Sequence, residues 1–212
     1  MKRTVLILAL MAAGLGAQAQ HEVGTWSVTP RVGVNLSKLS DQEVIYEGLE
    51  SNAKTAKAKY KWGMTAGAEA EYQAWPQVAV SAGVLYSNEG YTYGKIPDTG
   101  ELSQTLHFVN IPLLLNFYIE PNLLPGLALK AGVQMGFLAK ATRHTDGTTD
   151  DNKNEYNTVN VSIPAGISYT YKGFTADFRY NIGVSNLCKV PDTNWKWRTG
   201  SFWLTLGYQF VL

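Results

Sequence analysis

The sequence predicts an all-β protein, an eight-stranded antiparallel up-and-down transmembrane β-barrel. Two observations predict it: apolar and polar residues alternate in eight segments, and the connections between these segments are alternately long and short. Strict alternation is typical of a strand with one apolar and one polar face. Alternately long and short connections are typical of small outer-membrane barrels, which have short periplasmic turns and longer external loops.

The N-terminus predicts export. Lys2 and Arg3 precede an apolar run from Val5 to Leu15, and a small-residue site, Ala17-Gln18-Ala19, follows it. This order is typical of a secretory signal peptide, and the apolar run is too short to span a bilayer. We therefore expect residues 1–19 to be a signal peptide and residues 20–212 to form one barrel domain.

The alternation is clearest in FTADFRYNIGVS, residues 174–185. Phe178 and Tyr180 belong to its apolar set, whereas Asp177 and Arg179 belong to its polar set. The same division appears in residues 26–37, 59–72, 78–89, 127–140, 156–171 and 201–210. A strand of about 12 residues, rising ~3.3 Å per residue and tilted by ~45°, is long enough for the apolar band of an outer membrane.

The remaining segment, HFVNIPLLLNFY at residues 107–118, breaks the pattern. Leu106 and Phe108 follow one phase of the alternation, and the apolar residues from Val109 onward follow the other. This slip predicts a β-bulge in the segment. Pro112 and Pro164 lack an N–H donor, so we expect them where strand pairing is interrupted.

The predicted connections fall into two classes. The long and polar ones are residues 38–58, 90–103, 141–155 and 186–199, and the short ones are residues 74–76, 121–126 and 172–173. This order places the N-terminus in the periplasm and four loops outside the cell.

Glycines and aromatic residues indicate which face is inside. Nine glycines share the phase of the polar set, and small residues inside a narrow barrel make room for long neighbours. Aromatic residues of the apolar set gather near both ends of the segments, as in the two interfacial girdles of a membrane barrel. We therefore expect the polar face to line the lumen and the apolar face to contact outer-membrane lipid. A soluble lipocalin-like barrel or a β-sandwich is the alternative.

Charged residues of the polar set are predicted to form a network in the lumen. Its expected members are Arg31, Glu69, Glu71, Lys130, Asp177 and Arg179. Lys59, Lys61, Glu89 and Lys140 are assigned to the lumen as well. Because the interior of eight strands is filled by side chains, a structural salt-bridge network is favoured over a catalytic carboxylate pair.

The fourth long connection interleaves aromatic and basic residues at Trp195, Lys196, Trp197 and Arg198. Cations next to indole rings suit the phosphates and sugars of lipopolysaccharide, so these residues are candidates for an outer-leaflet contact. The alternative, which we favour, is an interfacial aromatic anchor at the start of the last strand.

Other chemistry has little support. Loss of Lys2 and Arg3 changes the formal charge from +1 to −1, so no basic field predicts a nucleic-acid partner. A single cysteine, Cys188, excludes an internal disulfide and a zinc site built from cysteines. His144-Thr145-Asp146 with Ser162 is a weak candidate for acyl transfer, and a calcium site in the Asp-rich run at 146–151 is disfavoured. We expect no catalytic residue, metal or cofactor.

Six stretches resemble a known family. They are PRVGVNLSKL, AVSAGVLYSNEGY, VNIPLLLNFYI, LKAGVQMGFL, FRYNIGVSNL and WLTLGYQF. Together they span nearly the whole mature chain, and they are similar to the Bacteroidetes outer-membrane β-barrel proteins that include the PorT-like group. The resemblance implies an eight-stranded barrel, and some members of the family serve secretion machinery. It carries no catalytic motif.

The expected function is therefore non-enzymatic. We expect a monomeric barrel that presents external loops as a scaffold or is an accessory of an envelope or secretion complex. A small-solute channel and a lipid-modifying barrel enzyme are the alternatives.

Overall fold

The computed structural model describes residues 22–40, 43–46, 54–96, 100–119, 123–145, 147–189 and 196–212. The predicted signal peptide, residues 1–19, lies outside the described residues. No helix in the described part of the chain is long and apolar enough to cross a membrane.

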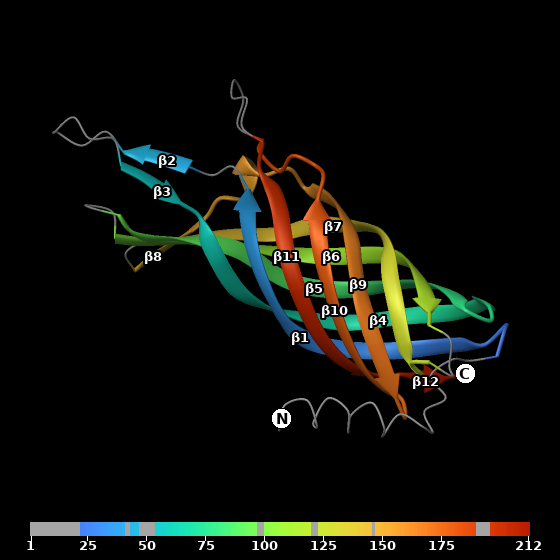
Figure 1. Cartoon of the computed structure of the whole chain (residues 1–212). Coiled ribbons are helices and arrows are strands. Elements are labelled where there is room, and N and C mark those ends of the chain that lie inside the picture. The colour runs from blue at the N-terminus through green and yellow to red at the C-terminus, as the bar shows by residue number, and fades with distance from the viewer. Residues whose placement is uncertain are drawn as a thin grey trace, which may run out of the picture.

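Eight antiparallel strands close into a barrel, which confirms the predicted fold class (Figure 1). They are β1 (Trp26–Ser40), β4 (Lys59–Trp75), β5 (Val78–Ile96), β6 (Gly100–Tyr118), β7 (Leu127–Thr145), β9 (Val159–Tyr171), β10 (Phe174–Gly183) and β11 (Arg198–Tyr208). Each strand pairs with the next, and β11 pairs with β1 from Arg31↔Gly207 to Ser40↔Arg198. The last strand resumes after Gln209 as β12 (Phe210–Val211), which also pairs with β1. Closure leaves the barrel without a free edge.

Four shorter elements lie in the predicted long connections. Strands β2 (Glu43–Tyr46) and β3 (Lys54–Lys57) form a separate two-stranded sheet. Strand β8 (Thr148–Asp151) pairs with the last residues of β7, and a 3-10 turn follows at Lys153–Glu155. We call this end of the barrel the long-connection end and the opposite end, which holds the described parts of both termini, the short-turn end.

The turn between β9 and β10 shows how the short connections are made. Tyr171 pairs with Phe174, so only Lys172 and Gly173 join the two strands. Both have positive φ, 49° and 84°, as a type I′ hairpin turn requires. A Cβ at Gly173 would also lie 2.8 Å from the ring of Tyr208, so both the backbone conformation and the available space favour glycine.

The strands differ in length at the long-connection end. β5, β6 and β7 have 19 residues each, whereas β10 has 10 and β11 has 11. The predicted loop at residues 90–103 is therefore wrong, because β5 and β6 stay paired as far as Ile96↔Gly100. Figure 1 shows this β5–β6 hairpin, in green, projecting away from the barrel mouth. One wall of the barrel, formed by β5, β6 and β7, is thus taller than the wall formed by β9, β10 and β11.

The predicted β-bulge in β6 is also wrong, because the bulge lies in the neighbouring strand. Burial alternates without interruption along β6, with Leu106 and Phe108 both inward and fully buried. The register shift occurs in β7, where His107 pairs with Lys140 but Phe108 pairs with Leu138. The extra residue turns Lys140 outward, which corrects its assignment to the lumen.

Both prolines lie where strand pairing is interrupted, as predicted. The β5–β6 ladder is absent between Ala82↔Leu113 and Leu85↔Asn110, on either side of Pro112. The β7–β9 ladder is absent between Ala131↔Ala165 and Gln134↔Ser162, on either side of Pro164. A missing N–H donor therefore removes no ladder bond at these positions.

The polar face is inside, as predicted. On β10, Asp177 and Arg179 are 0% and 2% exposed, whereas Phe178 between them is 46% exposed. Outward aromatic residues also gather at both ends of the barrel: Trp26 packs on Tyr72 at the short-turn end, and Tyr60 and Tyr180 pack around Phe202 nearer the long-connection end. This surface has the apolar band and aromatic girdles of a membrane barrel.

We predict that Phe178→Arg prevents or slows insertion, because it places a charge against hydrocarbon in the middle of β10. The expected cost is about 2–4 kcal/mol near the bilayer midplane. Phe178→Leu, the matched control, should be nearly silent because lipid requires an apolar side chain and little shape. The measurement is the fraction of protein that shows the folded gel mobility after refolding into lipid vesicles. Equal folding of the two variants would mean that this face does not meet lipid.

Candidate functional site

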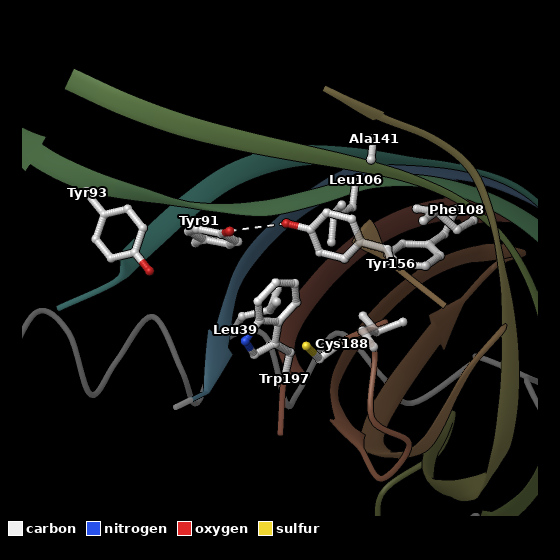
Figure 2. Close-up of a cluster of buried hydrophobic side chains, with 11 residues drawn as sticks. Leu39, Tyr91, Tyr93, Leu106, Phe108, Ala141, Tyr156, Cys188 and Trp197 are labelled. Carbon is white, nitrogen blue, oxygen red and sulfur yellow. Dashed lines mark hydrogen bonds between the residues drawn. The ribbon is translucent and has the colours of Figure 1, made fainter. Parts of the chain in front are cut away.

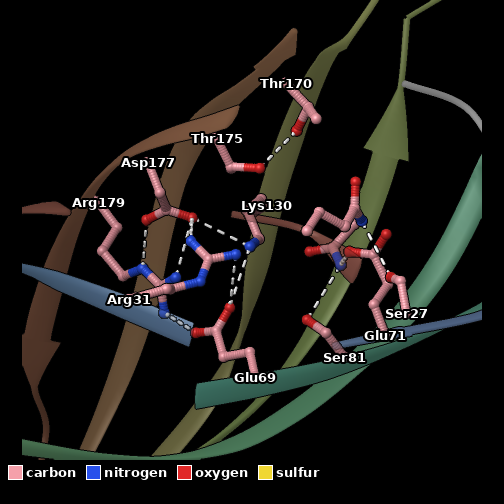
Figure 3. Close-up of polar contacts among 12 residues, drawn as sticks. Ser27, Arg31, Glu69, Glu71, Ser81, Lys130, Thr170, Thr175, Asp177 and Arg179 are labelled. Carbon is pink, nitrogen blue, oxygen red and sulfur yellow. Dashed lines mark hydrogen bonds and ion pairs between the residues drawn. The ribbon is translucent and has the colours of Figure 1, made fainter. Parts of the chain in front are cut away.

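Five charged side chains meet in the middle of the lumen, and we call them the ionic cluster (Figure 3). They are Arg31 from β1, Glu69 from β4, Lys130 from β7, and Asp177 and Arg179 from β10. All five are at most 6% exposed. The four strands stand around the barrel, so the ionic cluster ties opposite walls together.

Asp177 and Glu69 are the two acceptors of the ionic cluster. Asp177 pairs with Arg31 at 2.9 Å, Lys130 at 3.0 Å and Arg179 at 2.7 Å. Glu69 pairs with the same three cations at 3.0, 3.4 and 2.8 Å, respectively. Every cation thus contacts both carboxylates. The ionic cluster keeps one net positive charge, from three cations and two carboxylates.

Glycines on neighbouring strands make room for these long side chains. A Cβ at Gly166 would lie 2.7 Å from the Cβ of Arg179, and one at Gly83 would lie 2.7 Å from the Cγ of Glu69. Gly207 has the same relation to Arg31, whose Cγ would be 3.1 Å away. The inward glycines therefore fit the ionic cluster because a larger residue would occupy the same volume.

Glu71 does not belong to the ionic cluster, although we expected it there. Its carboxylate accepts hydrogen bonds from Asn116 and from the hydroxyl of Tyr118, both at 2.5 Å. The amide of Asn116 also donates to Ser81. Glu71 is two residues nearer the short-turn end than Glu69, which separates it from the cations and gives it neutral donors.

Glu89 and Trp203 occupy the lumen on the other side of the ionic cluster. Glu89 is 5% exposed and accepts a hydrogen bond from Ser87 at 3.1 Å, with Ser201 and Trp203 also next to its carboxyl group. Trp203 is fully buried and faces inward. Sequence reasoning missed this tryptophan as a lumen residue. The signal was its phase, which it shares with the inward Ser201 and Thr205.

A cluster of buried apolar side chains lies at the long-connection end of the barrel, and we call it the apolar plug (Figure 2). Its buried members are Leu39, Tyr91, Tyr93, Leu106, Phe108, Leu138, Ala141, Tyr156, Leu187, Cys188 and Trp197. The hydroxyl groups of Tyr91 and Tyr156 are 3.2 Å apart. Burial raises the pKa of Tyr156 to about 12, so this phenol stays neutral. The inner ends of the tall wall are therefore apolar, unlike the middle of the lumen.

Two of the long connections supply part of the apolar plug and are joined to each other. Leu187 accepts a backbone hydrogen bond from Asn157 at 2.8 Å and donates one to Trp197 at 2.8 Å. The Asn186 side chain accepts from the backbone N–H groups of Cys188 and Trp197. These bonds hold the connection after β10 against the one before β9, across the barrel mouth.

The structure removes Trp197 from the candidate outer-leaflet contact at residues 195–198. Trp195 lies outside the described residues, and Lys196 and Arg198 are exposed. Trp197 is only 7% exposed and packs on Tyr156, with ring centroids 5.3 Å apart. It faces the apolar plug because its backbone is hydrogen-bonded to the Asn186 side chain and to the Leu187 backbone, which fixes this stretch over the mouth. Trp197 therefore cannot grip lipid from this position.

Two other lysines assigned to the lumen lie outside it, and the residues of the weak acyl-transfer candidate lie far apart. Lys59 is exposed, and Lys61 bonds Ser103 and Thr105, which belong to the outward phase of β6. His144 is exposed and contacts Thr149 at 2.6 Å. Ser162 is buried and pairs with Gln134, ten positions before His144 on β7 and so about 30 Å away along the strand. No nucleophile and base are brought together there.

We predict that Asp177→Asn destabilises the barrel more than Arg179→Leu does. Asp177→Asn leaves three buried cations to share Glu69, at a cost of about 3–5 kcal/mol. Arg179→Leu leaves two cations with two carboxylates, so a smaller cost of about 1–3 kcal/mol is expected. The urea midpoint of the barrel refolded in vesicles measures both.

Phe178→Leu, on the outward face of the same strand, is the control for that comparison. The double variant Asp177→Asn/Arg179→Leu should lose less stability than the sum of the two single variants, because their side chains share partners. Additive losses, or an unchanged midpoint for Asp177→Asn, would show that the ionic cluster does not hold the barrel together.

Comparison with known proteins agrees with this geometry. The chain is similar to Neisserial surface protein A (14% identity, 87% of this chain and 97% of that one, TM-score 0.50). It is also similar to the attachment invasion locus protein Ail of Yersinia pestis in complex with the heparin analogue sucrose octasulfate (16%, 89% and 100%, 0.49) and to OprG of Pseudomonas aeruginosa (13%, 91% and 98%, 0.48). At these identities the likeness concerns the fold alone.

No curated protein sequence matches the chain. The family model described as "Outer membrane protein beta-barrel domain" matches residues 17–189, which is well over half of the 212 residues. Together with the closed barrel, its apolar outer band and its polar interior, this match places the protein in the outer membrane as an integral barrel. The chain belongs to the outer membrane protein β-barrel domain family.

Proposed function

We propose that this protein is a non-enzymatic, non-conducting barrel that acts through its external surface, as a scaffold or as an accessory of an envelope or secretion complex. The observation that carries the proposal is the filled lumen. Buried side chains meet inside the barrel at three levels: Glu71 with Asn116, the ionic cluster, and the apolar plug. A barrel of eight strands is narrow enough to be filled in this way.

The channel alternative is disfavoured by the same three levels. An ion entering from the long-connection end would meet buried apolar side chains such as Phe108 and Leu106, which offer no ligands. Below them it would meet the ionic cluster, whose side chains are already paired. Opening a path would require breaking buried ion pairs, which is costly.

The long-connection end supports the scaffold role. The tall wall of β5, β6 and β7 extends past the shorter wall, and the third and fourth long connections are bonded to each other. These hydrogen bonds join the described parts of the two connections into one surface. A partner of the envelope would dock there, and the apolar flank would be covered by lipid, so the barrel needs no second copy.

Two further parts of the proposal concern export and chemistry. Residues 1–19 are a cleaved signal peptide, and the long-connection end is outside the cell. No nucleic acid, metal or cofactor is invoked, because the proposed role needs only a folded surface. The lipid-modifying alternative would require His144, which is far from Ser162 along β7.

We predict no steady ion conductance from the purified protein in a planar bilayer, because the lumen is filled. The variant Trp203→Ala is measured beside the unaltered protein, because it removes the largest fully buried side chain and leaves the outer face unchanged. Folded gel mobility of both samples shows that barrels were inserted. Stable, reproducible single-channel steps from the unaltered protein would overturn the scaffold proposal in favour of a pore.

We predict that trypsin added to intact cells cleaves after Lys54 or Lys57 and leaves Lys172 uncut. Lys54 and Lys57 lie in β3, which pairs only with β2, and an isolated two-stranded hairpin is marginally stable. Lys172 lies in a tight turn at the opposite end of the barrel. Mass spectrometry of the released peptides gives the answer, with lysed cells as the control. Cleavage at Lys172 alone would show that the orientation is reversed.

A further inference from the structure

The β-bulge in β7 places a lysine on the outer wall of the barrel. Without the extra residue, Lys140 would share the inward phase of Leu138, but the bulge turns it outward, where it is exposed. A bulge that re-aims a side chain in this way is often part of a site. Lys153 lies at the same bulge, because its ammonium group donates to the carbonyl oxygen of Ala139 at 3.0 Å.

Two more basic groups lie next to Lys140 on this wall. His107 is its direct partner across the β6–β7 ladder. Lys61 reaches β6 from the other side, where its ammonium group donates to Ser103 Oγ at 2.8 Å and to Thr105 Oγ1 at 2.5 Å. Thr105 is two residues from His107 in the same outward phase of β6. Three basic side chains from three strands thus converge on the outer face of β6.

His107 is oriented by the lipid-facing aromatic band. The Tyr86 hydroxyl is 2.5 Å from His107 Nδ1, and the two rings are stacked with centroids 6.0 Å apart. This contact leaves Nε2 as the ring atom that can reach a ligand. The position of the imidazole is therefore fixed by Tyr86 before any ligand binds.

The three basic groups lie at the upper edge of the apolar band. Val109 on β6 and Phe137 on β7 lie next to these groups on the side of the short-turn end, and both face outward, at 36% and 38% exposure. His107 is two residues beyond Val109, or about 7 Å along the strand. With the predicted orientation, this is the level at which hydrocarbon ends and outer-leaflet headgroups begin.

Two described carboxylates near this wall have other partners. Glu155 pairs with Arg143 at 2.5 Å, and Asp151 accepts the backbone N–H of Lys153. Within the part of the chain that the structure describes, neither Lys61 nor Lys140 forms a salt bridge. Unpaired cations at a membrane surface attract anionic headgroups.

We propose that Lys61, His107 and Lys140 form a phosphate-binding site on the outer wall of β6, and that its ligand is the phosphorylated headgroup of an outer-leaflet lipid. The lysines supply charge, and His107 Nε2 supplies a directed hydrogen bond. The acyl chains of the same lipid lie along Val109, Phe137 and Tyr86. The site rests on the outer-membrane location and the predicted orientation, and it is independent of whether the lumen conducts.

The test uses the full barrel refolded into phosphatidylcholine nanodiscs that contain a limiting amount of bisphosphorylated lipid A. The lipid A retained per barrel after a detergent wash is counted by mass spectrometry. Lys140→Gln/His107→Gln should retain on the order of fivefold less, because one cation and the hydrogen bond are lost. Lys172→Gln, which removes one exposed positive charge at the short-turn end, should retain as much as the unaltered protein.

Two further arms identify the ligand. Lipid A without its phosphates should not be retained, and inorganic phosphate at the same concentration should not displace the bound lipid, because it lacks acyl chains. Retention that is equal in Lys140→Gln/His107→Gln and Lys172→Gln would overturn the site. Equal retention of the dephosphorylated lipid would overturn phosphate recognition, and displacement by free phosphate would overturn the lipid as the ligand. Folded gel mobility is checked for every variant before retention is compared.

Discussion

The structure depends on one constraint: a chain that crosses hydrocarbon must satisfy every backbone N–H and C=O group within itself. Pairing of β11 with β1 meets this constraint by closing the ladder. The two prolines show how strictly it applies, because Pro112 and Pro164 lie where a neighbouring ladder is already interrupted. Closure also fixes which side of each strand faces lipid, so the apolar set of a strand lies on the outside and its polar set lines the lumen.

Closure with eight strands leaves a narrow interior, and the charged side chains inside it are therefore buried and paired. Long polar side chains such as Arg179 are buried there, because the interior of eight strands is just wide enough to be filled by side chains. Buried charges are tolerated only when paired, and in the ionic cluster each of three cations contacts both Glu69 and Asp177. Glycines at positions such as 83 and 166 supply the volume. The lumen is thus a polar core held between opposite walls.

The unequal walls decide what happens at the long-connection end. Because β5, β6 and β7 continue beyond β10 and β11, their inward faces leave the membrane band without an opposite wall. The connections on either side of β9 and β10 fold over these faces and bury Tyr156, Leu187 and Trp197 against them. The same end carries the β7 bulge that turns Lys140 outward. The difference in strand length therefore accompanies both the apolar plug and the basic side chains on the outer wall of β6.

The sequence by itself determined the fold class, the inward and outward faces of most strands and the five charged residues of the ionic cluster, because a period of two residues is a local property of each strand. Only the tertiary structure decided where the bulge lies. Leu106 and Phe108 are apolar and were therefore expected to face lipid, but both face inward, so β6 contains no bulge. Only the tertiary structure separated Glu71 from the ionic cluster, because contacts across the lumen depend on the relative stagger of distant strands. The burial of Trp197 and Trp203 has the same cause: the mouth and the interior of a closed barrel are formed by residues far apart in the chain.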